Sequence, residues 1–222
     1  MKNVLITGAS GNLGKVVVDE FLKRGHRIIT THSRQPLPAS AGNIQYVVDL
    51  TNEGQVNDMV ADIHLRFEVI DAALFLAGGF ESGDIQHTDS NAIRRMIAMN
   101  VETAFNTARA VYLKMKKQKT GGRIVFIGAQ PALMPELGMR HIAYSLSKSL
   151  LFRLMEHLNA DAAGTEFKAC ILVPGTIDTP DNRKWNPDAD FSKWVTPEIM
   201  AGQMEQILHT PVKELTDPVF LL

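Results

Sequence analysis

Apolar runs of strand length alternate along the chain with longer stretches of helical periodicity. Gly, Pro, Asp or Asn bound each run, and the runs are Val4–Thr7, Arg27–Thr31, Ile44–Val48, Ala72–Leu76, Arg123–Ile127 and Lys168–Val173. The clearest early helix is Gly14–Arg24, where Val17 and Phe21 can share one face. Strands that alternate with helices predict a parallel sheet of about seven strands. Crossover helices on both faces of such a sheet explain why its strands are apolar throughout.

Two stretches depart from this regular alternation. Asn91–Lys117 is long enough for two helices or for one bent helix. Pro174–Trp194 is polar, contains proline and lacks clear periodicity, and a loop of that length is usually functional or mobile. We therefore expect a substrate lid over residues 174–197. Nothing that resembles a repeat or a linker divides the 222 residues, so a single domain over residues 1–222 is expected.

The composition argues against several classes of binding partner. A net charge of -1 gives no general attraction for polyanions, which argues against a nucleic acid or an anionic membrane as partner. Apolar runs stay below the ~18 residues of a membrane span, and the first strand begins too early to leave room for a signal peptide. The single cysteine, Cys170, is expected to be a small buried hydrophobe, which fits a cytoplasmic protein. The seven histidines show no ligand-like spacing, so no metal is expected.

A glycine-rich turn separates the first strand from the first helix. In Thr7-Gly8-Ala9-Ser10-Gly11-Asn12-Leu13-Gly14, Gly8 permits the tight turn and Gly11 lets the backbone approach a pyrophosphate. Gly14 allows close packing of the helix on the sheet, and the helix N-terminus offers free N–H groups to phosphate. A plain structural turn would have the same letters. Its position between strand and helix favours a dinucleotide site on a doubly wound, Rossmann-type α/β sheet with helices on both faces.

The end of the second strand indicates which dinucleotide is bound. An NAD enzyme usually has an acidic residue there, but this chain continues from His32 to Ser33 and Arg34. Arg34 could bind the 2′-phosphate of NADP with help from the Ser33 hydroxyl, although a solvated loop arginine is the alternative. NADP(H) is therefore expected as the preferred cofactor, with NAD(H) as the second choice. Asp49, after the third strand, could reach the adenine or could cap a turn.

Tyr144 and Lys148 lie four residues apart and so share one face of a helix. A free tyrosine with a pKa of ~10 is a poor acid or base near neutrality. A nearby ammonium group favours the phenolate, so Lys148 is expected to lower the pKa of Tyr144. Such pairs are common on helix surfaces, and only the glycine-rich turn makes this one a candidate catalytic pair.

The chain resembles the short-chain dehydrogenase/reductase family in four features. These are the glycine-rich turn, the Tyr144 and Lys148 pair, Asn100 in a long helix, and the segment Pro174-Gly175-Thr176-Ile177-Asp178-Thr179. The resemblance implies that Tyr144 is the general acid or base, that Lys148 also binds the nicotinamide ribose and that Asn100 holds a proton-relay water. It implies a cofactor site composed of Gly8, Ser10, Gly11, Asn12, Leu13, Gly14, Ser33, Arg34, Asp49, Leu50, Ala77, Gly78, Gly79, Lys148, Pro174, Gly175, Thr176, Ile177 and Thr179.

Two departures from the family pattern point to one branch. The family's carbonyl-polarising serine is absent from Gly128-Ala129-Gln130, and its Asn-Asn-Ala-Gly is replaced by Phe75-Leu76-Ala77-Gly78. Both changes resemble the dihydropteridine reductase branch, as does the stretch from Thr179 to Trp194. His32-Ser33-Arg34 does not match the NADH preference of animal members of that branch.

The expected activity is hydride transfer from NADPH to a small carbonyl or conjugated imine, such as a quinonoid dihydropterin, with Tyr144 as proton donor. Reduction of another ketone or enone, or a catalytically silent dinucleotide sensor, are the alternatives. Phe80, Trp185, Phe191 and Trp194 could stack on a flat substrate or could anchor a loop. A homodimer or tetramer is expected, because the helices Asn100–Lys117 and Tyr144–Ala162 have surplus apolar residues, namely Val101, Phe105, Ala108, Val111, Leu151, Leu154 and Leu158.

Overall fold

The computed structural model describes residues 1–36, 38 and 41–222 and contains a seven-stranded sheet in the order β3-β2-β1-β4-β5-β6-β7. All neighbouring strands pair in parallel. The strands are β1 (Asn3–Thr7), β2 (Arg27–His32), β3 (Asn43–Val47), β4 (Ala72–Phe75), β5 (Gly122–Ile127), β6 (Phe167–Val173) and β7 (Val219–Leu221). The six predicted strands are confirmed to within a residue at each end, and β7 was not located from the sequence.

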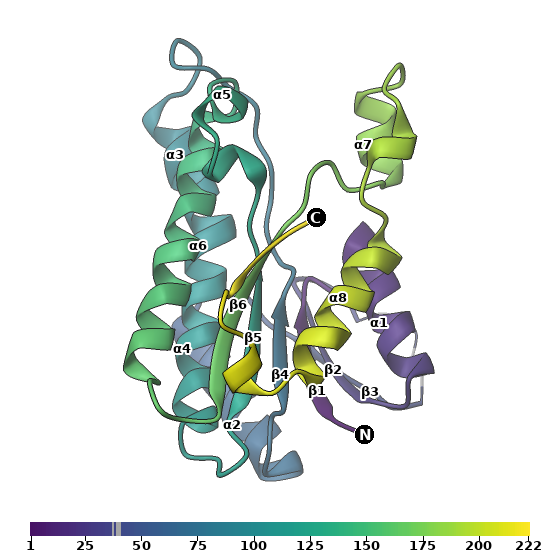
Figure 1. The fold of residues 1–222 in the computed structure, drawn as a ribbon, viewed down its shortest axis with the longest axis vertical. Helices are drawn as coiled ribbons and strands as arrows, with labels where there is room; N and C mark the ends of the chain where they lie inside the picture. Colours follow the sequence, from purple (N-terminus) through teal and green to yellow (C-terminus); the bar gives the residue numbers. More distant parts are fainter. Residues whose placement is uncertain (37, 39–40) are drawn as a thin grey trace.

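Helices cover both faces of the sheet (Figure 1). They are α1 (Asn12–Lys23), α2 (Glu53–Phe67), α3 (Ser90–Ile97), α4 (Thr103–Met115), α5 (Pro135–Gly138), α6 (Ile142–Asp161), α7 (Pro180–Trp185) and α8 (Pro197–His209). Short turns of tighter helix form η2 (Gln130–Ala132), η3 (Phe191–Lys193) and η4 (Val212–Glu214). A π-helical turn, η1 (Ala98–Glu102), joins α3 to α4, so the prediction of a bent or divided helix is confirmed.

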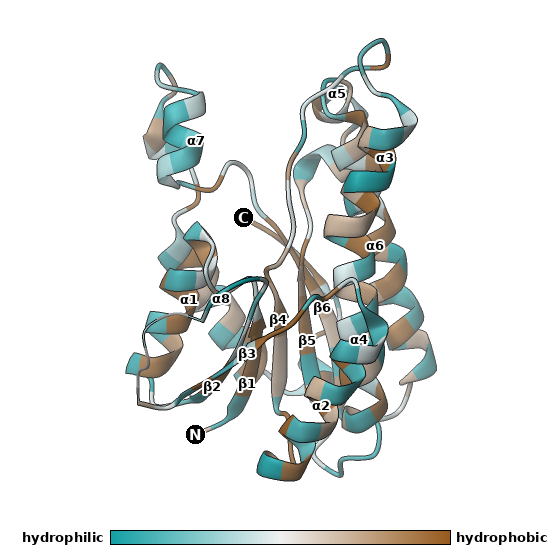
Figure 2. Cartoon of the chain, turned by 180° about the vertical axis from the view of Figure 1, so that it is seen from behind, coloured by the Kyte–Doolittle hydropathy of each residue, from teal (hydrophilic) through white to brown (hydrophobic). Residues whose placement is uncertain are grey.

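The sheet separates two apolar cores, and successive strand residues alternate between them. Val4 and Ile6 pack with α1 and α8, whereas Leu5 between them packs with α2, α4 and α6. Figure 2 shows apolar strands between helices whose outer faces are polar. Cys170 is fully buried in the α1 and α8 core, as predicted, and burial raises the pKa of its thiol to about 12. Within the described residues no helix is long and apolar enough to cross a bilayer.

The strand order reverses between β1 and β4, and this is where open α/β sheets bind ligands. At the carboxyl end of β1 the chain turns through Gly8 into α1, and at the carboxyl end of β4 it passes through Gly78 and Gly79. The carboxyl ends of β5 and β6 lead to Ala129 and Pro174 at the same edge. Segments far apart in the sequence therefore meet at one edge of the sheet, beneath the projecting α7 and α5 (Figure 1).

The segment expected as an irregular lid is partly helical. It contains α7, which Thr179 caps by accepting a hydrogen bond from the Asn182 N–H through its hydroxyl (3.2 Å), and the short turn η3. Its two ends are tied together, because Val195 donates to the Thr176 carbonyl and accepts from the Asp178 N–H. The segment therefore projects as a closed loop from one narrow base.

The surplus apolar positions on α4 and α6 need a correction. Ala108, Val111, Leu151 and Leu158 are buried in the core of their own subunit, so they form no second face. The exposed large apolar side chains on these helices are Phe105 and Leu113 on α4 and Leu146 and Leu150 on α6, and only Phe105 belongs to the predicted set. Most of the residues chosen from the sequence are therefore wrong for an outer face, and the pairing of these helices stays a prediction.

Replacement by alanine should have opposite effects on stability at two helical glycines. A Cβ at Gly14 would lie 2.2 Å from the Gly8 carbonyl oxygen, whereas no described heavy atom lies within 4 Å of a Cβ at Gly202. We expect Gly14→Ala to destabilise the fold by about 1–3 kcal/mol through overpacking. Gly202→Ala should stabilise it by up to about 1 kcal/mol, because alanine has the higher helix propensity. Chemical denaturation of both variants measures this, and a neutral Gly14→Ala would contradict the close packing.

Candidate active site

The glycine-rich turn forms a cradle at the switch point. Gly8 has a φ of 67°, and a Cβ there would lie 2.6 Å from the backbone nitrogen of Ala77. Thr7 fixes the same neighbour, because its hydroxyl accepts a hydrogen bond from the Ala77 N–H (3.1 Å). Helix α1 then starts after Gly11 with no side-chain cap and no acidic residue in its first turn among the described residues. Its N–H groups are therefore available to an anion.

The end of β2 is neutral or basic. His32 is buried, and burial lowers the pKa of its imidazole, so the ring is uncharged near neutrality. Ser33 and Arg34 follow it and are exposed. Asp49 serves as a turn residue, because its Oδ1 accepts from the N–H (2.9 Å) and the hydroxyl (2.7 Å) of Thr51. Asp49 therefore acts as a turn residue, and Asn52 is the residue that caps α2. A contact of Asp49 with the adenine stays a prediction.

Asn100 joins three parts of the site through one side chain. Its Oδ1 accepts from the Gly79 N–H (2.9 Å), and its Nδ2 donates to the Gly79 carbonyl (3.1 Å) and to the Ser147 hydroxyl (3.0 Å). Asn100 lies in η1, where π-helical geometry interrupts the usual ladder of helical hydrogen bonds. Because both ends of the amide are occupied, the side chain itself has little capacity left for the predicted relay water.

Tyr144 and Lys148 share one face of α6, as predicted, but their electrostatics differ from the prediction. The Lys148 Nζ is buried, lies 5.8 Å from the centre of the Tyr144 ring and donates to the Ile127 carbonyl (2.9 Å). Burial raises the pKa of Tyr144 to about 12 and lowers the pKa of Lys148 to about 8. The expected lowering of the phenol pKa is therefore wrong for this structure, because loss of solvent outweighs the attraction of the ammonium group.

The carboxyl end of β4 lies against this pair. A Cβ at Gly78 would lie 2.5 Å from the Asn100 Oδ1 and 3.7 Å from the Lys148 Nζ. The predicted residues Gly78, Gly79, Asn100 and Lys148 are thus brought together. Leu50, Ser33, Arg34 and Asp49 belong to the β2 and β3 ends of the same sheet edge.

Ala129 and Gln130 occupy the place of the absent serine after β5. Ala129 is buried and offers only a methyl group. The Gln130 Nε2 lies 3.6 Å from the position that a Cβ on Gly175 would take, so this amide faces the Pro174–Thr179 segment after β6. Gln130 is therefore a polar side chain that could take part where the serine is absent.

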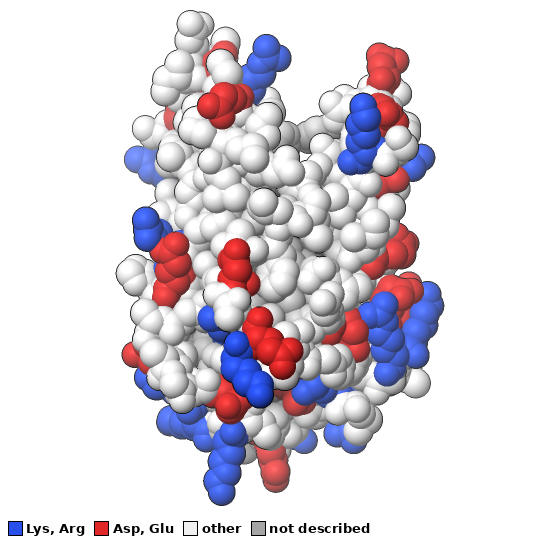
Figure 3. Space-filling model, viewed as in Figure 1, with Lys and Arg blue, Asp and Glu red and all other residues white. Residues whose placement is uncertain are grey.

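Phe80 is the centre of an aromatic group at the mouth of the site. Its ring centre lies 5.0 Å from that of Tyr144, 4.9 Å from that of His141 and 6.0 Å from that of Trp185 on α7. Phe80 and Trp185 are both exposed. Figure 3 shows a hollow between the α5 and α7 projections, with uncharged surface at its floor and charged residues on both projections. Phe191 and Trp194 instead contact each other, with tilted rings whose centres lie 4.7 Å apart.

Comparison with known proteins agrees with this geometry. The model of the short chain dehydrogenase family matches residues 2–190. The chain belongs to that family. A dihydropteridine reductase of Dictyostelium discoideum is 28% identical over 222 residues, which cover 99% of this chain and 86% of that protein. A 2-(R)-hydroxypropyl-CoM dehydrogenase of Xanthobacter autotrophicus is 29% identical over 79% of this chain and 74% of its own length.

Solved structures show the same fold. A structure of ElxO with NADP bound superposes with a TM-score of 0.87 at 24% identity, covering 99% of this chain and 96% of that one. Serine dehydrogenase from Escherichia coli gives a TM-score of 0.84 at 21% identity over 99% and 96% of the two chains. The family and the Rossmann-type fold predicted from the sequence are confirmed, and the protein is an oxidoreductase of the short chain dehydrogenase type.

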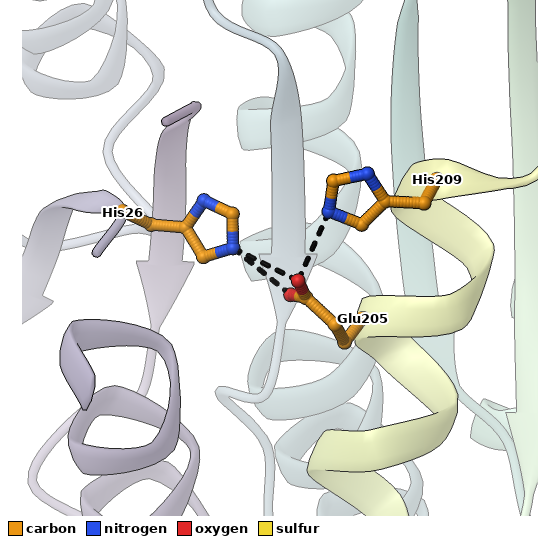
Figure 4. Close-up of side chains that lie close together, drawn as sticks. All are labelled: His26, Glu205 and His209. Atoms are coloured by element: carbon orange, nitrogen blue, oxygen red, sulfur yellow. Dashed lines mark hydrogen bonds and ion pairs between the residues drawn. The ribbon is translucent and has the colours of Figure 1, made fainter. Parts of the chain in front are cut away.

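A histidine cluster that the sequence did not reveal lies at the opposite edge of the sheet from the dehydrogenase site. His26 and His209 flank the Glu205 carboxylate, with each Nε2 3.0 Å from its Oε1 (Figure 4). The Lys2 N–H donates to the His26 Nδ1 (3.2 Å), so the neutral ring carries its proton on Nε2, where a metal would have to bind. The cluster acts as a hydrogen-bonded brace between α8 and the turn before β2, and the absence of a metal stays a prediction.

Burial of Lys148 should cost stability. Its pKa is about 8 when folded and 10.5 ordinarily. Below pH 8 the Lys148 amine is protonated in both the folded and the unfolded state, so the full cost of burying its charge is present. Between pH 8 and 10.5 the amine is protonated only in the unfolded state, so the free energy of unfolding rises with pH. We expect Lys148→Met to raise the free energy of unfolding at pH 7 by about 1–3 kcal/mol, and the gain to shrink from pH 8 towards 10.5. Denaturation across this range measures it, and a gain that is independent of pH would contradict the cause.

Proposed function

We propose that this protein is an NADPH-dependent reductase of a flat, conjugated substrate, with quinonoid dihydropterin as the leading candidate. The observation that carries the proposal is the meeting of Tyr144, Lys148 and Asn100 at the switch point, beneath an open aromatic group centred on Phe80. Membership of the short chain dehydrogenase family supports hydride transfer as the reaction.

The residues present fit a nicotinamide dinucleotide. Gly8 permits the tight turn and Gly14 the close packing of α1, since a Cβ at either would contact neighbouring backbone below 3.0 Å. Gly11 between them lets the backbone approach a pyrophosphate. The uncapped N-terminus of α1 supplies the positive end of a helix dipole to the phosphates. Gly78 keeps open the space beside Lys148, where the nicotinamide ribose would bind, and Gly175 would border the nicotinamide. When bound, the cofactor supplies the hydride.

Tyr144 is proposed as the proton donor. With a pKa of about 12 the phenol keeps its proton throughout the neutral range, which suits the reducing direction. In the reduction the substrate carbon receives the hydride, and its oxygen or nitrogen receives the phenolic proton. The Lys148 ammonium then lies beside the new phenolate and stabilises it. Asn100 holds the Gly79 loop and α6 in register, so Tyr144 and Lys148 face the cofactor from a fixed helix.

Two features support a ring substrate over a simple ketone. Ala129 has no hydroxyl with which to polarise a localised carbonyl, whereas a conjugated ring spreads the developing charge. Phe80 and Trp185 offer exposed aromatic faces to a flat molecule. The 28% identity to a dihydropteridine reductase supports the same substrate class. Another ketone or enone is the second candidate.

A substrate panel tests the proposal. We expect NADPH oxidation to be at least about tenfold more efficient with quinonoid dihydropterin than with aliphatic ketones, a difference of about 1.4 kcal/mol in transition-state stabilisation. Turnover confined to aliphatic ketones or enones would refute the ring substrate and favour that class of substrate instead.

Tyr144→Phe separates an enzyme from a silent sensor. Removing the phenolic proton should lower kcat by at least about 100-fold, the usual scale of general acid catalysis. NADPH binding should change little, because the ring and its packing against Phe80 remain. Stopped-flow turnover and fluorescence titration measure the two effects. Unchanged turnover would remove Tyr144 from the mechanism.

Arg34→Ala tests the choice of cofactor. The end of β2 has a neutral His32 and an exposed Arg34, which suits a 2′-phosphate. Losing one charge-assisted phosphate contact should weaken NADPH binding by roughly tenfold or more and leave NADH binding unchanged. Arg24→Ala, an exposed arginine at the far end of α1, is the control. An equal loss for both cofactors would exclude Arg34 as a 2′-phosphate ligand.

We also propose a homodimer built on α4 and α6. Leu146 and Leu150 lie one helical turn apart on α6, and with Phe105 on α4 they expose 45–54% of their surface, which is costly for a single chain. An isologous pairing of these helices would cover them. Leu146→Arg should convert the protein to monomer in sedimentation at micromolar concentration. A wild-type monomer that persists with NADPH would refute the dimer.

A further inference from the structure

The turn that follows β5 is fastened to the helix that carries the reactive pair. The Ser145 hydroxyl of α6 donates to the Pro131 carbonyl (2.7 Å), and the Lys148 Nζ donates to the Ile127 carbonyl (2.9 Å). These two bonds fix the backbone on both sides of Gln130, the first residue of η2. Because its backbone is tied to α6, Gln130 has a defined position relative to the reactive pair on that helix.

The side chain of Gln130 has hydrogen-bonding groups to spare. It is half-buried, yet within the described part of the chain its amide makes no hydrogen bond. The backbone carbonyl of the same residue accepts from the N–H groups of Leu133 and Met134 (2.9 Å each), so the turn is complete without the side chain. Polar groups that lose access to water usually have a partner. The two N–H donors and the oxygen of this amide are therefore free for a ligand.

The amide faces the edge of the sheet at which the reactive pair lies. Its Nε2 lies 3.6 Å, and its Cδ 4.0 Å, from the position that a Cβ on Gly175 would take, so the side chain extends from the end of β5 towards the end of β6. Gly175 has no side chain to fill the space beside it. Lys148 reaches the end of β5 from α6. Donor groups therefore meet at this edge from two elements, namely the phenol and the ammonium group of α6 and the amide of η2.

We propose that Gln130 is a catalytic residue whose Nε2 donates a hydrogen bond to an acceptor atom of the substrate, where negative charge gathers as the hydride arrives. The electron pair of the hydride forms the new C–H bond, and the π pair of the reduced double bond moves onto the conjugated oxygen or nitrogen. Tyr144 supplies the proton, and Gln130 keeps both of its own. A neutral donor held where charge develops lowers the barrier without a proton transfer of its own.

The amide also narrows the class of substrate. Its N–H group and its oxygen lie side by side, so it can pair with an acceptor and a donor that are adjacent on one edge of a ring. A conjugated heterocycle with an amide-like edge, such as quinonoid dihydropterin, has this pattern, and an aliphatic ketone does not. Ala129, the preceding residue, is buried and offers only a methyl group, so Gln130 supplies the side-chain donor of this turn. The inference rests on the proposed function for the reduction itself.

Two substitutions of Gln130 test the contact. Gln130→Ala should lower kcat with quinonoid dihydropterin by at least about tenfold, since losing one such donor costs roughly 100- to 1000-fold where the charge is localised. Gln130→Glu keeps the size of the side chain and replaces the donor with a carboxylate, so kcat should fall at least as far. NADPH binding in a fluorescence titration should change less than about twofold in both variants, because the contact is with the substrate. Gln203→Ala, which removes a half-buried amide from α8 on the other face of the sheet, is the matched control and should leave kcat unchanged.

Different results overturn the inference and the proposed function. An unchanged kcat in Gln130→Ala, or a Gln130→Glu variant as active as wild type, removes Gln130 from the reaction and leaves the proposed function standing. A loss of NADPH affinity as large as the loss of kcat assigns the amide to the cofactor and also overturns the inference. If wild type reduces only another ketone or enone, the same variants are compared on that substrate, because its carbonyl oxygen can accept the same bond. A wild type that reduces none of these compounds refutes the proposed function and the inference with it.

Discussion

The site depends on one amide. Asn100 bonds to both backbone groups of Gly79 and to the Ser147 hydroxyl, and Ser147 in turn donates to the Tyr144 carbonyl (2.7 Å). A loop from the sheet, a π-helical turn and the helix with the reactive pair are thus held by neighbouring hydrogen bonds that are shielded from water. Buried networks of this kind are strong when every group is satisfied and costly when one is lost. The geometry of Tyr144 and Lys148 therefore derives from contacts that neither of them makes.

The parallel sheet explains why these parts meet. All carboxyl ends of parallel strands lie at one edge, and the reversal of order between β1 and β4 separates the helices that follow them. Glycines are then required at two close approaches: a Cβ at Gly8 would meet the backbone of Ala77, and a Cβ at Gly78 would meet the side-chain oxygen of Asn100. The same edge carries α7 as a closed loop on a narrow base, which allows that loop to move without disturbing the sheet.

Local signals in the sequence predicted the fold well. Alternating strand and helix patterns located six strands, and the glycine spacing located the cradle. The details that were missed depend on contacts between distant residues. The Ser147 hydroxyl, the Asn12–Asp181 bond and the His26–Glu205–His209 brace join segments that carry no mutual signal in sequence. The amphipathic pattern also could not separate Ala108 from Phe105, because sheet-facing and outward apolar residues differ only in their tertiary surroundings.

Burial also changes how the reactive pair must be understood. Spacing alone suggested that Lys148 lowers the pKa of Tyr144, yet in the free protein loss of solvent disfavours charge on both groups. Before the reaction, the neutral phenol of Tyr144 lies beside the Lys148 ammonium group, whose charge is destabilised by burial. When the phenol gives up its proton, the new phenolate is opposite in charge to Lys148, so an unfavourable isolated charge becomes a favourable pair. An interaction that gains strength only as the reaction proceeds is the kind that accelerates it.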